Sequence, residues 1–116
     1  MSPTDFKAII APFFWSESEQ SASFCLADLG YRNEILQSRA AEGFEGNGYD
    51  WASLAKVFLA EKQPQLAGSV KFDPEGSMFC AYSSDKDALN QFALAFKAAV
   101  EETSLIKDVF SRAELD

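Results

Sequence analysis

Few side chains in this chain are of a type that does chemistry, and their surroundings favour no reaction. The chain has no histidine, so the commonest general acid or base and the commonest zinc ligand apart from cysteine are missing. A cysteine nucleophile needs an activating base or a strongly cationic neighbourhood. Neither stands beside Cys25 or Cys80 in the sequence, so we expect no enzyme, no catalytic residue, no metal and no cofactor.

The acidic and glycine-rich segments also fail the patterns of known sites. Asp73, Glu75, Asp85 and Asp87 lack the spacing of a calcium loop, and paired carboxylates this close in a sequence are common without being a glycosidase pair. Residues 43–48 contain three glycines but neither the lysine nor the Ser or Thr of a phosphate-binding loop. The glycines therefore indicate an unusual backbone shape.

The charged and aromatic residues of the chain indicate which classes of partner it can bind. Ten basic against eighteen acidic residues give a formal charge of −8, which disfavours phosphate backbones and anionic membranes as partners. The same charge attracts a basic protein, although it also keeps a small protein in solution. Phe13, Phe14 and Trp15 could stack on nucleic-acid bases, but only Lys7 is near them, so core packing is the better interpretation.

The cysteines and the N-terminal residues predict the cellular compartment of the protein. Cys25 and Cys80 each lie in an apolar run, where a free thiol behaves as a small buried hydrophobe, so we expect both to be reduced. The start MSPTDFKAII has no cationic segment followed by a long apolar stretch, and no apolar run reaches the length of a membrane span. We expect one cytoplasmic domain over residues 1–116.

The first half of the chain predicts a hairpin and then a helix. Residues 6–15 and 21–29 are rich in apolar and aromatic side chains and read as paired strands. Pro12 suggests an edge strand or a bulge, because proline lacks the N–H donor. Residues 31–42 favour a short helix that Gly43 ends.

The middle of the chain predicts a second helix and a second hairpin. Asp50 stands where an N-cap should, and residues 51–59 repeat apolar side chains at helical spacing until Pro64 stops the helix. Alternating residues from Ser69 to Tyr82 then form a hairpin, whose type I turn at residues 73–76 places Gly76 in the left-handed position.

Two further helices complete the chain. Ser84 with Asp87 forms a capping-box pattern before an amphipathic helix that ends near Glu101, and Thr103 caps a last helix through Phe110. The predicted order is β-β-α-α-β-β-α-α. It favours an α+β fold with an antiparallel sheet of two hairpins and helices on one face.

Two motifs together resemble a known family. Residues 43–51, GFEGNGYDW, lead into a helix, and residues 72–82, FDPEGSMFCAY, follow in the expected order. In this combination, over about residues 6–100, the chain resembles the immunity protein 51 family of bacterial polymorphic toxin systems. The resemblance implies a cytoplasmic antitoxin, encoded beside its toxin, that binds the toxin and blocks its active site or an adjacent surface without a cofactor.

Both motifs also have structural interpretations. Asn47 and Gly48 shape the turn, Asp50 caps the helix, Trp51 packs in the core and Gly76 belongs to the hairpin bend. Family motifs of this kind hold a fold together, whereas the surfaces that meet toxins diversify.

For the toxin contact we predict side chains that the irregular loop and the hairpin project, because exposed loops present residues that a scaffold has positioned. These are Glu42, Glu45, Tyr49, Asp73 and Glu75. Carboxylates that face a basic toxin would contribute strongly, since close charge pairs across an interface couple by about 1.5–7 kcal/mol. Two other classes stay open, namely an acidic protein-binding adaptor unrelated to toxins and an enzyme or ligand carrier that uses carboxylates in a pocket.

Overall fold

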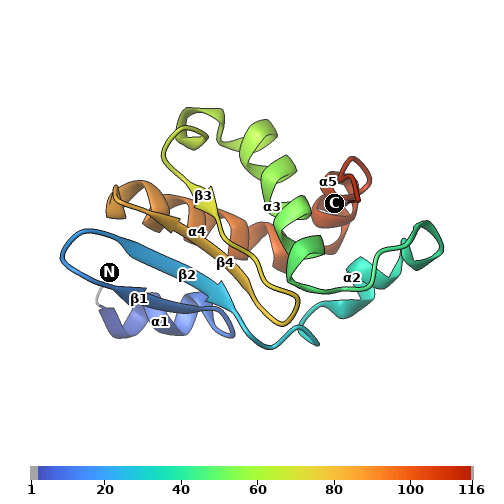
Figure 1. Cartoon of the computed structure of the whole chain (residues 1–116), viewed down its shortest axis with the longest axis horizontal. Coiled ribbons are helices and arrows are strands. Elements are labelled where there is room, and N and C mark those ends of the chain that lie inside the picture. Colours follow the sequence, from blue (N-terminus) through green and yellow to red (C-terminus); the bar gives the residue numbers. More distant parts are fainter. Residues whose placement is uncertain (1–2, 116) are drawn as a thin grey trace.

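A four-stranded antiparallel sheet with strand order β1-β2-β4-β3 organises the molecule (Figure 1). The computed structural model describes residues 3–115. The strands are β1 Phe14–Glu17, β2 Ala22–Leu26, β3 Lys71–Phe72 and β4 Phe79–Ser83. β1 with β2 and β3 with β4 form two hairpins, and β2 pairs with β4 between them. The predicted antiparallel sheet of two hairpins is therefore confirmed.

Helices cover one face of this sheet. They are α1 Pro3–Ile10, α2 Asn33–Gln37, α3 Gly48–Lys62, α4 Lys86–Glu101 and α5 Thr103–Phe110, with 3₁₀ turns η1 Ala40–Glu42 and η2 Pro64–Leu66. α4 packs on β2 and β4, α3 packs on β4, and α1 packs on α4 beside β1. Figure 1 shows α4 running behind the strands. The α+β class is confirmed, and the predicted order matches apart from the additional helix α1 before β1.

Aromatic side chains fill the space between the sheet and the helices. Phe24 of β2 lies edge-on to Phe92 of α4 with ring centroids 6.2 Å apart, and Phe79 of β4 lies 6.0 Å from Phe96. All four of these side chains are fully buried. Truncation of a buried phenylalanine to alanine typically costs about 3–5 kcal/mol, so this layer fixes how the helices sit on the sheet.

The first predicted strand, residues 6–15, is wrong over most of its length. Phe6 and Ile10 are helical, and their spacing of four residues places both on the buried side of α1 while Ile9 remains exposed. Strand β1 begins only at Phe14. Pro12 lies in the turn between the two elements, and β1 is an edge strand. A short apolar run fits either period, and here packing against α4 selects the helix.

The caps of the last two helices also differ from the prediction. Asp85, not Ser84, is the N-cap of α4, and its Oδ1 accepts from the backbone N–H of Ala88 at 3.0 Å. Thr103 is the first residue of α5 and its side chain does not cap the helix. Instead, its Oγ1 accepts a hydrogen bond of 2.7 Å from the Arg32 guanidinium.

The prediction of two reduced cysteines is contradicted. Cys25 and Cys80 form a disulfide, with their Cα atoms 4.2 Å apart. The two residues are direct partners in the register of β2 and β4, and opposed residues of neighbouring strands have their Cβ atoms close enough to be bridged. The apolar runs around each cysteine correctly indicate strands, but only the register between the strands brings the two sulfurs together.

Candidate functional site

The loop before α3 is held by a reciprocal set of hydrogen bonds. Asn47 is the N-cap, and its side-chain oxygen accepts from the backbone N–H of Asp50 at 2.9 Å. The Asp50 carboxylate reaches back and accepts from the N–H groups of Glu45 at 2.7 Å and Gly46 at 2.8 Å. The predicted N-cap at Asp50 is therefore wrong. Asp50 lies three residues into the helix and, only 4% exposed, fixes the path of the loop that precedes it.

Gly48 joins this loop to the β3–β4 hairpin. A Cβ atom at this position would lie 2.0 Å from the carbonyl oxygen of Glu75 and 2.3 Å from that of Met78. The Gly48 N–H donates to the Gly76 carbonyl at 3.2 Å. No side chain fits between the two backbones, so glycine is required here by close approach rather than by its backbone angles.

The hairpin bend is tighter than predicted. Glu75 and Met78 exchange two backbone hydrogen bonds of 2.8 and 3.2 Å, which leaves Gly76 and Ser77 as the bend. Gly76 does not adopt a positive φ, so the predicted type I turn at residues 73–76 with a left-handed glycine is wrong. The ladder continues through Asp73 and Glu75 instead, and both side chains are exposed.

Four of the five predicted contact residues gather around this junction, and we refer to them as the loop–hairpin surface: Glu45, Tyr49, Asp73 and Glu75. Tyr49 is 43% exposed, and its ring lies beside Gly76. Glu45 and Tyr49 line an open depression of about 440 Å³. Its lining residues are Gly43, Glu45, Asn47, Tyr49, Asp50 and Leu115. The two sequence motifs therefore build one continuous surface.

Glu42 is engaged elsewhere. Its carboxylate accepts two hydrogen bonds from Arg39, at 2.7 and 2.8 Å, and the bond from Arg39 holds the pKa of the Glu42 carboxyl below its usual range. The Arg39 guanidinium also donates to the carbonyls of Phe110 and Ala113 and lies over the rings of Phe44 and Phe110. Glu42 thus helps to tie η1 to the end of α5.

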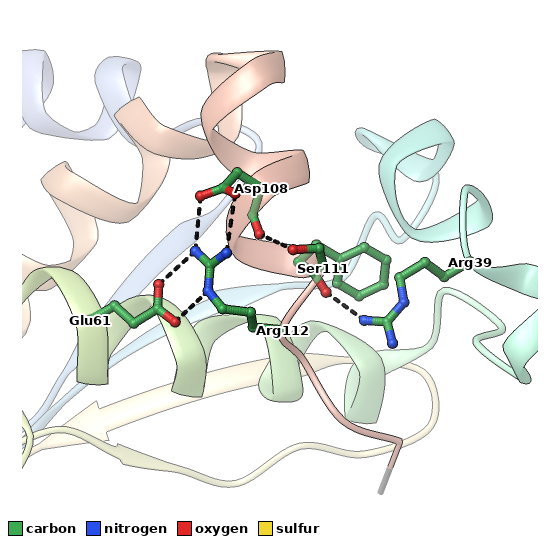
Figure 2. A network of polar contacts seen from close by, with 6 residues as sticks. Arg39, Glu61, Asp108, Ser111 and Arg112 are labelled. Atoms are coloured by element: carbon green, nitrogen blue, oxygen red, sulfur yellow. Dashed lines mark hydrogen bonds and ion pairs between the residues drawn. The ribbon is translucent and has the colours of Figure 1, made fainter.

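A second arginine extends these contacts, as Figure 2 shows. Arg112 donates to Glu61 of α3 at 2.7 and 2.8 Å and to Asp108 of α5 at 2.9 and 3.1 Å. Hydrogen bonds from Arg112 lower the pKa values of both carboxyls. We call the five residues Arg39, Glu42, Glu61, Asp108 and Arg112 the paired network. The i,i+4 spacing of Asp108 and Arg112 could have been recognised in the sequence, but the contribution of Glu61 could not.

The loop–hairpin surface has no such basic partners. The sequence contains no Lys, Arg or His between Arg39 and Lys56, nor between Lys71 and Lys86. Within residues 3–115, the side chains of Asp73 and Glu75 make no hydrogen bond or ion pair, and Glu45 accepts only from the Asn47 amide. Folding therefore brings two base-free acidic segments together and leaves their charges uncompensated.

The remaining motif residue is structural. Trp51 is fully buried and packs edge-on to Phe13 and Phe96 and parallel to Tyr31.

In the described part of the chain, no group of three or more His, Cys, Asp or Glu side chains is placed to hold a metal ion. None of the helices described is both long and apolar enough to cross a membrane.

The antiparallel sheet with helices on one face defines a small α+β protein. The family model described as Immunity protein 51 matches residues 13–115, and the chain belongs to that family. The resemblance in the sequence is thereby confirmed, and the match extends beyond Val100 to include α5. No curated protein and no solved structure is significantly similar to the chain.

Proposed function

We propose that this protein is the cytoplasmic antitoxin of a bacterial polymorphic toxin system and neutralises its cognate toxin domain by binding it through the loop–hairpin surface. One observation carries the proposal. Gly48 joins two acidic segments that contain no base, and among residues 3–115 no cation pairs with the carboxylates that these segments expose. Membership of an immunity protein family supplies the class of partner.

The proposed mechanism is steric and electrostatic. Uncompensated carboxylates create a negative field that speeds the encounter with a basic partner and selects its orientation. After docking, Tyr49 contributes a rigid aromatic side chain to the contact, as tyrosine commonly does at the centre of interfaces. The bound protein then covers the toxin's active site or an adjacent surface, with no bond made or broken and no cofactor.

Co-expression tests this function directly. The toxin to test is the C-terminal domain of any large secreted protein that is found encoded immediately upstream of this gene. We expect wild-type protein to restore growth and to form a stable complex with an inactivated form of that domain. Continued killing together with no complex would reject the proposal for that pair and leave the acidic adaptor as the better explanation.

Charge reversal tests the surface. The double variant Glu45→Lys with Glu75→Lys should weaken binding at least about tenfold in calorimetry, given the usual size of close interfacial charge pairs. The matched control is Glu19→Lys with Asp87→Lys, which makes the same change in net charge at exposed acids near the other end of the sheet. Unchanged affinity of the first variant would exclude the loop–hairpin carboxylates, and equal loss in both would indicate net charge alone.

The place of action is testable through the disulfide. Disulfides are rare and mostly labile in the cytosol, so in a cytoplasmic antitoxin the Cys25–Cys80 disulfide should be open to reduction in growing cells. Alkylation of cells quenched in acid, followed by mass spectrometry, measures both states. A pair that is fully oxidised in the cell would argue for an oxidising compartment instead.

A further inference from the structure

Within residues 3–115, no helix covers the second face of the sheet. Trp15 lies edge-on to Phe6 of α1 and Phe24 lies against Phe92 of α4, so these residues of β1 and β2 point toward the helices. Successive side chains of a strand point to opposite sides. Phe14 and Ser16, which flank Trp15, therefore point away from the helices.

On β1, β2 and β4 the same alternation places six residues on this side, which we call the outer face: Phe14, Ser16, Ser23, Cys25, Cys80 and Tyr82. Phe14 is 44% exposed and Tyr82 is 41% exposed, while Ser16 is also exposed. Cys25 is the strand partner of Phe14, and its disulfide to Cys80 ties β2 to β4. The outer face is thus a rigid patch with exposed aromatic side chains and small hydroxyl groups.

The outer face is continuous with the acidic surface. Asp73 donates its backbone N–H to the Cys80 carbonyl at 3.0 Å, and Glu75 pairs with Met78 two residues further along the ladder. Direct partners in an antiparallel pair point to the same side, so Asp73 and Glu75 border the outer face. Lys71, the partner of Tyr82, places one base at the opposite end of this edge.

We propose that the outer face is the second part of the toxin contact, so that the cognate toxin domain presents an apolar patch beside its basic side chains. This inference rests on the proposed function and specifies the chemistry of its partner. The charge of Asp73 and Glu75 selects a basic protein, and exposed aromatics on a fixed sheet provide apolar contact area at low conformational cost.

A second copy of this chain is a poorer occupant of the same face. A two-fold symmetric contact places the same patch on both partners. The acids that border one outer face would then face or flank those of the other, and like charges in close contact are unfavourable. A basic partner removes that repulsion.

Two kinds of variant test the inference. Phe14→Thr with Tyr82→Thr removes the aromatics but keeps residues that favour strands, and Ser16→Arg adds bulk and charge to the outer face without removing packing. Ile9→Ala is the control, since it truncates an exposed apolar residue that is 45% exposed on α1. We expect each outer-face variant to bind the inactivated toxin domain about tenfold or more weakly, the loss typical of central interface residues, and the control to bind like wild type.

The results separate this inference from the proposed function. If Glu45→Lys with Glu75→Lys weakens binding but all outer-face variants bind normally, the outer face is outside the contact and only this inference fails. If wild-type protein forms no complex, both fail. A wild-type chain that is dimeric in sedimentation, and becomes monomeric with Phe14→Thr and Tyr82→Thr, would assign the outer face to a second copy and overturn the inference. Thermal melts close to wild type would establish that the variants are folded.

Discussion

The paired network and the loop–hairpin surface both contain Asp and Glu side chains, but within residues 3–115 these are paired with arginines in the first region and unpaired in the second. In the paired network, each carboxylate accepts hydrogen bonds from an arginine that also contacts another element, so the charges hold η1, α3 and α5 together. On the loop–hairpin surface, the backbone is held by the close approach of Gly48 to the hairpin and by the buried Asp50. Its exposed carboxylates contact no base in the described part of the chain. Acidic residues that stabilise the fold and acidic residues available to a partner are thus separated in space.

This separation has an energetic reason. Exposed ion pairs contribute little to stability, typically about 0–1 kcal/mol each. The absence of basic residues from the loop–hairpin surface therefore lowers the free energy of unfolding only slightly. The same absence leaves a negative field that a basic partner can neutralise. The net charge of the whole protein does not reveal this difference between the two regions. The positions of Arg39 and Arg112 in the folded chain do.

The largest expected effect comes from the junction of the loop and the hairpin. Gly48→Ala places a Cβ within 2.3 Å of two carbonyl oxygens of the hairpin backbone, and we expect unfolding to become easier by about 3 kcal/mol or more. Urea denaturation measures the change. Gly68→Ala is the matched control, since nothing lies within 4 Å of a Cβ built there, and it should change stability by less than about 0.5 kcal/mol. Equal behaviour of the two variants would show that the hairpin does not approach the loop closely.

A somewhat smaller effect is expected at Asp50. Asp50→Ala leaves the N–H groups of Glu45 and Gly46 without their carboxylate partner, and hydrogen bonds to a charged acceptor contribute about 1.5–3 kcal/mol. We expect a loss of about 2 kcal/mol by thermal and urea denaturation. Asp87→Ala, an exposed acid in the first turn of α4, should lose no more than about 1 kcal/mol. A loss at Asp50 no larger than at Asp87 would contradict the role assigned to Asp50.

A smaller effect again is expected when the paired network is opened. Arg39→Met keeps much of the aliphatic side chain but removes the donors to Phe110 and Ala113, so we expect a loss of about 1 kcal/mol. Toxin affinity should remain at the wild-type value, because the paired network lies outside the proposed contact. Lys56→Met, at an exposed residue of α3 with no ion pair among the described residues, is the control. Weaker toxin binding by Arg39→Met at unchanged stability would contradict the claim that the paired network lies outside the contact.

The smallest effect is the dependence of stability on pH. The pKa values of Glu42, Glu61 and Asp108 are lowered in the folded protein by their arginine partners. Their stabilising contribution is therefore present above the unfolded pKa values of about 4 and is lost as the pH falls through the lower folded values. The urea midpoint should fall below pH 5, and Arg112→Met should reduce that fall. An identical pH profile for Arg112→Met would show that these pairs do not stabilise the fold.

Periodicity predicted the elements that have a long, one-sided apolar pattern. The helix that begins near Trp51 and the helix that carries Phe92 and Phe96 were predicted with ends close to those observed. The prediction from periodicity was wrong at residues 6–15, where many apolar side chains within ten residues fit both a strand and a helix. Caps were misplaced by one to three residues, because several Ser, Asp and Asn side chains near each helix start can serve the same purpose.

The arrangement of the loop–hairpin surface could be predicted from the sequence only in part. Glycine-rich composition indicated the loop, but the approach of Gly48 to the hairpin depends on atoms that are nearly thirty residues apart in the chain. The disulfide between Cys25 and Cys80, separated by 55 residues, depends in the same way on strand register. Glu42 looked equivalent to Glu45 in the sequence, and only the position of Arg39 in the folded protein separates them.

Hydrogen exchange of the complex tests the central claim most directly. With the inactivated toxin domain bound, backbone amides of residues 43–50 and 73–82 should exchange more slowly than in the free protein, while those of the C-terminal part of α5, up to Phe110, should be unchanged. Protection confined to α5 and the paired network, with residues 43–50 and 73–82 unaffected, would contradict the assignment of the loop–hairpin surface to the toxin.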